Sequence, residues 1–141
     1  MMRIVISFFL LLASVTSLAD ETPRRANIDP DVWFVASGGL WKKSDTEYGN
    51  FRVIVRNEGW EHTRSSLYLQ WLKSDDQKQR IVVLKEMPVS EFNSGGWFNV
   101  LHIERRDSTF LISYLARGED TNKNAELRPG LPGVYRFVVR K

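Results

Sequence analysis

The segment from Trp60 to Arg64 gathers side chains that can do chemistry or recognition more closely than any other part of the chain. Trp60 follows Gly59, and an acid, an imidazole and, after Thr63, a guanidinium come next in the chain. An indole at a turn offers a large contact area at low entropic cost, and charged neighbours can orient a partner. The sequence therefore predicts a binding surface made of Trp60, Glu61, His62 and Arg64.

Metal-ligand spacing is missing from this sequence. The two histidines, His62 and His102, are far apart, and neither belongs to a short-spaced ligand pair. Glu61 is adjacent to His62, but adjacent residues of a strand point to opposite faces and make a poor chelate. The chain has no cysteine, which excludes disulfides, thiolate metal sites and a cysteine nucleophile. We expect no metal site and no cofactor.

Catalytic motifs are also missing. The chain contains no Gly-x-Ser-x-Gly elbow, no Ser-x-x-Lys and no glycine-rich phosphate loop. Solvated strand faces explain the glutamates as well as a carboxylate pair for sugar hydrolysis does. We therefore predict no catalytic residues and a protein that is not an enzyme. A hydrolase whose site is assembled only in space is kept as the third reading.

Five tryptophans in 141 residues are the most informative feature of the composition. Trp33 and Trp71 lie in apolar segments, so we expect both in the core. Trp41, Trp60 and Trp97 each border a turn signal. Two readings stay open for these three: they plug the open ends of the fold, or they belong to a recognition surface.

The first residues predict a secretory signal peptide. Arg3 precedes an apolar run over 4–13, and the small residues Ser17 and Ala19 end the segment. We expect cleavage after Ala19, which removes residues 1–19 and leaves residues 20–30 as a flexible leader. The apolar run is too short for a comfortable membrane span, so the mature chain is expected to be periplasmic or secreted and not membrane-spanning.

Period-two alternation dominates residues 31–141, which we expect to form one β domain. The unbroken apolar run Ile81–Leu84 is typical of a strand buried on both faces, and residues 118–132 read as a long polar connection. The spacing predicts an all-β, antiparallel β-sandwich of about seven strands, with a small closed β-barrel as the alternative. The expected strands cover residues 32–36, 51–56, 67–72, 81–84, 97–103, 110–115 and 134–139.

Charge and composition exclude some classes of protein. Hydrophobic residues make up 43% of the chain, which excludes wholesale disorder, and the net charge of +3 is too small to predict a nucleic-acid partner. A cysteine-free exported chain suits a bacterial cell envelope. We expect a soluble, non-enzymatic binding or accessory module that contacts an envelope protein or another macromolecule. The alternative from another class is a barrel that carries an apolar ligand.

Overall fold

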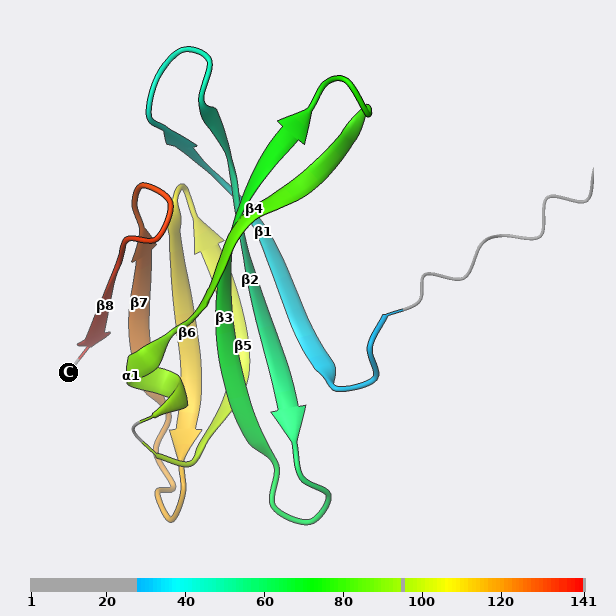
Figure 1. The fold of residues 1–141 in the computed structure, drawn as a ribbon. Coiled ribbons are helices and arrows are strands. Elements are labelled where there is room, and N and C mark those ends of the chain that lie inside the picture. Colours follow the sequence, from blue (N-terminus) through cyan, green and yellow to red (C-terminus); the bar gives the residue numbers. More distant parts are fainter. Residues whose placement is uncertain (1–27, 95, 141) are drawn as a thin grey trace, which may run out of the picture.

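The computed structural model describes residues 28–94 and 96–140, which form eight strands and one short helix (Figure 1). None of the helical structure in these residues is long and apolar enough to cross a membrane. The predicted signal peptide, its cleavage site and residues 20–27 of the predicted leader lie outside the described residues. The elements are β1 Val32–Lys42, β2 Tyr48–Glu58, β3 Arg64–Asp75, β4 Arg80–Pro88, α1 Ser90–Asn93, β5 Phe98–Arg106, β6 Thr109–Ala116, β7 Lys123–Pro129 and β8 Tyr135–Arg140.

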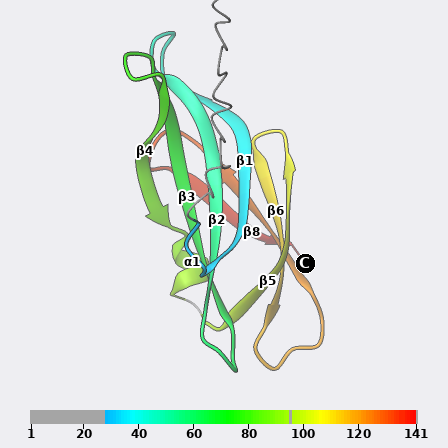
Figure 2. The ribbon, with the colours of Figure 1, turned by 90° about the vertical axis from the view of Figure 1, so that its right-hand side faces the viewer.

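The strands pair in two separate antiparallel sheets. The first sheet has the order β1-β2-β3-β4 and the second has the order β5-β6-β7-β8. Figure 2 shows the two sheets as layers that face each other. The predicted antiparallel sandwich is confirmed. The closed barrel is wrong, because each sheet keeps two edge strands instead of joining the other in one ring.

Alternating apolar residues build the core between the sheets. Phe51, Val53 and Val55 of β2 are buried, whereas Arg52 and Ile54 between them are half-buried on the outer face. This period of two recurs along most of β1 because successive side chains of a strand point to opposite faces, whereas the central strand β3 is buried on both faces over much of its length. The same buried cluster includes Leu67, Leu69, Trp71, Phe110, Ile112 and Leu127.

Helix α1 connects the sheets and closes one side of the core. Phe92 is 1% exposed, and its ring lies 4.9 Å from the ring of Phe98 and 5.4 Å from that of Tyr114. The next residue, Asn93, accepts a hydrogen bond from the Leu67 amide at 2.8 Å and donates one to the Leu67 carbonyl at 3.1 Å. Its side chain satisfies backbone groups of β3 beyond the end of β4.

The β1–β2 and β3–β4 hairpins project past the rest of the sandwich (Figure 1). Trp41 joins them: its indole is 2% exposed, and Nε1 donates to the Leu72 carbonyl at 3.2 Å. Gly49 pairs with Trp41 in the ladder, and a Cβ at this glycine would lie 1.8 Å from the Leu72 oxygen. The missing side chain lets the indole reach across β2. Of the two readings for Trp41, the structure supports the packing one.

Strand β7 lies inside the segment predicted as a long connection, so that prediction is wrong and the strands number eight. Only Ala125 and Leu127 mark its inner face. Glu126 between them is 4% exposed, and its carboxylate contacts Arg128 and Arg140. A small residue and a charged stretch gave β7 no clear alternation in the sequence.

The apolar run in β4 is not buried on both faces as predicted. Strand β4 forms one edge of the first sheet, and Ile81, Val83 and Leu84 are 72%, 46% and 45% exposed. A continuous apolar run therefore marks an exposed edge here. Lys85 contributes a charge and Pro88 lacks an amide donor, two features that discourage pairing with a further strand.

Candidate functional site

The β2–β3 turn presents the predicted binding residues at one end of the sandwich. Gly59 has φ +93°, and a Cβ at this position would lie 2.7 Å from the His62 carbonyl oxygen, so the turn depends on glycine. Trp60 is 98% exposed. Glu61 and His62 are exposed beside it. Three of the four predicted residues thus lie together on the surface.

Arg64, the fourth predicted residue, points elsewhere. It is half-buried, and its Nη2 donates to the Asn93 carbonyl at the end of α1. Its Nε is buried and has no hydrogen-bond partner in the described part of the chain. The guanidinium connects β3 to α1 instead of joining the exposed side chains of the turn.

Trp97 and Arg117 form a second aromatic feature at the same end. Phe98 pairs with Ala116 between β5 and β6, and the Arg117 amide donates to the Trp97 carbonyl at 3.0 Å. This register places the guanidinium carbon 5.2 Å from the centre of the Trp97 ring, a cation–π contact. The Trp97 indole donates to the Thr63 carbonyl at 3.0 Å, which joins β5 to the β2–β3 turn.

A hollow of about 360 Å³ lies between the turn and the Trp97–Arg117 pair. Its lining carries two acids and two basic groups, together with the indole and an amide. This mixture suits a partner with both polar and apolar groups better than a purely ionic one. The side chains that define it are Glu61, His62, Trp97, Asn99, Arg117 and Glu119.

Trp33 extends this end of the molecule. It is 60% exposed, so its expected place in the core is wrong, whereas Trp71 is fully buried as predicted. Trp33 lines a further hollow of about 330 Å³, and Thr63 and Asn99 line both hollows. We call the surface formed by Trp33, Trp60 and Trp97 the tryptophan end. The sequence pointed to Trp60 and Trp97 but missed Trp33, which looked like any apolar strand residue.

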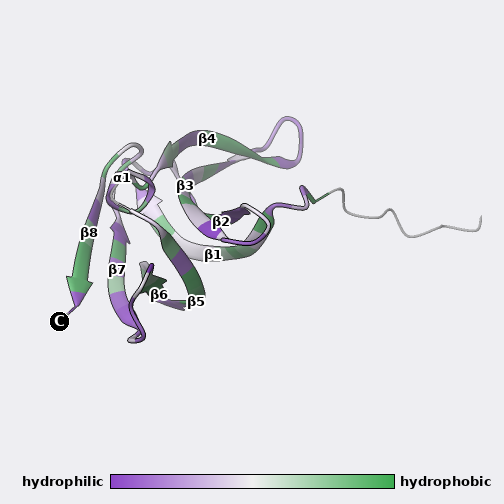
Figure 3. Cartoon of the chain, turned by 90° about the horizontal axis from the view of Figure 1, so that it is seen from below, coloured by the Kyte–Doolittle hydropathy of each residue, from purple (hydrophilic) through white to green (hydrophobic). Residues whose placement is uncertain are grey.

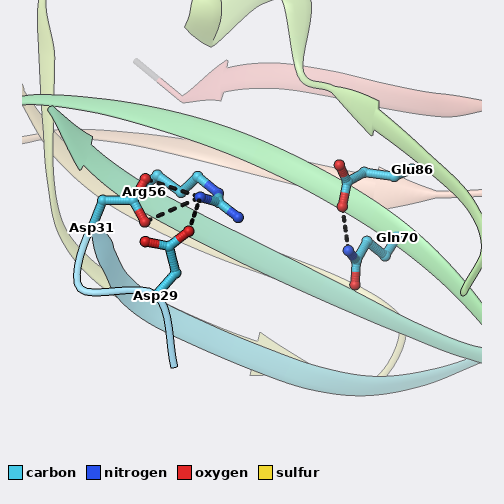
Figure 4. A network of polar contacts seen from close by, with 5 residues as sticks. All are labelled: Asp29, Asp31, Arg56, Gln70 and Glu86. Carbon is cyan, nitrogen blue, oxygen red and sulfur yellow. Dashed lines mark hydrogen bonds and ion pairs between the residues drawn. The ribbon is translucent and has the colours of Figure 1, made fainter. Parts of the chain in front are cut away.

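An ionic network fixes the chain just before β1 (Figure 4). Arg56 Nη1 lies 3.1 Å from Asp29 Oδ2 and 2.9 Å from Asp31 Oδ2. The hydrogen bond from Arg56 lowers the pKa of Asp29, and the bonds that Arg56 donates to Asp31 and then to Asp29 raise the pKa of Arg56. The Asn57 amide also donates to the Asp31 carbonyl at 2.8 Å. These contacts hold the start of β1 against β2, next to Trp33.

Within residues 28–94 and 96–140, no three His, Asp or Glu side chains gather as a metal site. No protein-family model, curated protein or solved structure matches the chain. The functional argument therefore rests on its own residues.

Proposed function

We propose that this protein is a non-catalytic binding module of the bacterial cell envelope that contacts another macromolecule through the tryptophan end. The observation that carries the proposal is the exposure of Trp60, which is 98% accessible at the tip of a hairpin. Exposed indole is unfavourable in water, and burying such a side chain on a partner recovers about 2–3 kcal/mol. Trp and Arg are also the residues that most often dominate binding energy at interfaces.

The surroundings of Trp60 support this proposal. Trp97 and Arg117 hold each other by a cation–π contact, and the Trp97 indole is fixed by its hydrogen bond to Thr63. These side chains lose little further freedom on binding, because the fold already orders them. His62 and Glu61, which directly follow Trp60, line the hollow beside Trp97 and can supply polar contacts.

Native mass spectrometry of the mature protein, purified gently from its own envelope, tests the proposal. The wild type is expected to carry a second macromolecule. Trp60→Ala should weaken that complex by about 30-fold, the effect of losing a hot-spot side chain of about 2 kcal/mol.

Leu131→Ala is the matched control. Leu131 is an exposed apolar residue, 47% accessible, in the β7–β8 loop at the opposite end of the sandwich (Figure 1). This variant should keep the complex. A complex that survives Trp60→Ala unchanged, or a wild type that carries no partner under any gentle condition, contradicts the proposal.

A further inference from the structure

The outer face of the first sheet carries a hollow far from the tryptophan end. Figure 3 views the molecule from one end and shows the curl of this sheet, with β1 and β4 at its two edges. The hollow encloses about 510 Å³, within the range of about 300–1,000 Å³ that is usual for small-molecule sites. We call it the outer groove; its main lining residues are Asn50, Arg52, Leu72, Lys73, Ile81 and Val83.

A chain of hydrogen bonds orients one guanidinium in the outer groove. Arg52 Nε donates to Gln70 Oε1 at 2.7 Å, and the Gln70 amide donates to Glu86 on the edge strand (Figure 4). Gln70 is only 6% exposed, so its amide is held in place. The terminal Nη groups of Arg52 form no hydrogen bond within the described residues and remain available. An arginine fixed in this way can bind an anionic group with two parallel hydrogen bonds.

The charges of the outer groove favour an anion. Arg52 lines it and forms no ion pair with any residue that the structure describes, whereas Lys73 follows Leu72 in the strand and extends its side chain to the opposite face of β3. No carboxylate lines the hollow. Glu86 lies nearby, but the Gln70 side chain stands between it and Arg52. Positive charge is therefore left unbalanced at one place on this face.

The apolar side of the outer groove adjoins that charge. Leu72 is 7% exposed, whereas Ile81 and Val83 of the edge strand are 72% and 46% exposed. In the ladder, Leu72 pairs with Val83 and lies two residues beyond Gln70, the partner of Arg52, so both face the same side of the sheet. An apolar strip thus begins next to the oriented guanidinium and continues along the β3–β4 hairpin.

We propose that the outer groove binds a single-chain amphiphile with an anionic head. The head contacts Arg52, and the apolar chain lies along Leu72, Ile81 and Val83. Because the head neutralises an unpaired cation while the chain covers exposed aliphatic side chains, each half of such a ligand matches one half of the groove. This site goes beyond the proposed function and lies on a different face from Trp60.

Titration of the mature protein with sodium decanoate, followed by calorimetry and by amide NMR shifts, tests the site. Decanoate is expected to bind with a dissociation constant below about 1 mM and to shift the amides of Leu72 and Val83. Arg52→Gln should weaken binding by about 10- to 100-fold. Ile81→Ser should weaken it by about 2- to 5-fold, because it removes an aliphatic contact of the chain; this exposed edge-strand position provides the test if Arg52→Gln fails to fold.

Two further variants distinguish a direct contact between the anionic head and Arg52 from an effect of the overall surface charge. Arg56→Gln changes an arginine four residues along the same strand whose guanidinium is already held by Asp29 and Asp31, so it should leave decanoate binding unchanged. Glu86→Gln keeps an acceptor for Gln70 and removes the nearby negative charge, so it should tighten binding by about 2- to 5-fold.

Three ligands test the two halves of the amphiphile. Decanol lacks the charge, acetate lacks the chain, and the peptide Glu-Glu-Glu carries charge without an alkyl tail; each should bind more than tenfold more weakly than decanoate. Equal binding of decanol overturns the role of Arg52. Equal binding of acetate or of the peptide overturns the amphiphile in favour of a simple anion or an acidic segment. Shifts confined to the tryptophan end, or no binding of decanoate, overturn the site itself.

Discussion

Replacing Gly49 by alanine places a methyl group where the backbone of β3 already lies. The new Cβ would stand 1.8 Å from the Leu72 carbonyl oxygen and 2.9 Å from the Trp41 indole nitrogen. A backbone oxygen cannot move aside by changing a rotamer, so the strands must separate. Overpacking of this kind costs about 1–3 kcal/mol. Displacing the oxygen also breaks the buried bond from Trp41, for a further loss of about 1–2 kcal/mol.

Gly49→Ala is therefore expected to lower the free energy of unfolding by about 2–5 kcal/mol, measured by urea denaturation with the wild-type m-value. Gly130→Ala is the matched control. Gly130 lies outside the left-handed region, and its Cβ would meet its nearest neighbour at an ordinary 3.5 Å. That variant should be neutral or slightly more stable. If Gly49→Ala were as stable as Gly130→Ala, the reasoning that joins Trp41 to β3 across this glycine would fail.

Two other perturbations test the polar contacts of the fold. The pKa of Asp29 is lowered by Arg56, so the stabilising contribution of Asp29 is fully present above its ordinary value of 3.8 and is lost as the pH falls through its lower folded-state pKa. Urea denaturation at several pH values should show a constant difference between wild type and Asp29→Asn above about pH 5 that shrinks below about pH 4. Asn93→Asp keeps the acceptor for the Leu67 amide but removes the donor to its carbonyl, and should lower the free energy of unfolding by about 1–3 kcal/mol at pH 7. The loss should be smaller near pH 4, where the introduced carboxyl group can be protonated and can donate.

Each of these tests has an outcome that contradicts it. A pH-independent difference between wild type and Asp29→Asn would show that the ion pair contributes nothing to stability. For Asn93, the control is Asn122→Asp in the exposed β6–β7 loop, which should leave stability unchanged. Equal losses of unfolding free energy in the two asparagine variants would mean that the hydrogen bonds from the Asn93 side chain to the backbone of β3 do not stabilise the fold.

Strand alternation was enough to predict the sandwich, because burial on one face imposes a period of two. Phe51, Val53 and Val55 display that period without interruption. Strand β7 was missed because its inner face offers only Ala125 and Leu127. The carboxylate between them is neutralised by arginines, one of which lies in β8, and a local pattern cannot show this contact.

The local sequence could not show which tryptophans are buried and which are exposed. Trp41 and Trp60 both follow closely after glycine, yet one is 2% exposed and the other 98%. The difference comes from Leu72, which lies on a strand far along the chain and whose carbonyl accepts a hydrogen bond from the Trp41 indole. Likewise, the contact between Trp97 and Arg117 depends on the register of β5 against β6, which only the folded ladder fixes.

The order of the strands also determines how the chain can fold. Every ladder of the described residues joins strands that are neighbours in sequence, and the chain passes from the first sheet to the second through α1, so the pairing of the first sheet is complete within residues 32–88. Loop closure within each sheet is short and entropically cheap, whereas contacts between the sheets are distant in sequence. We therefore expect the docking of two locally formed halves to be the slow step of folding. A chain cut near α1 would yield two complementary halves, each carrying one uncovered apolar face that the other is shaped to cover.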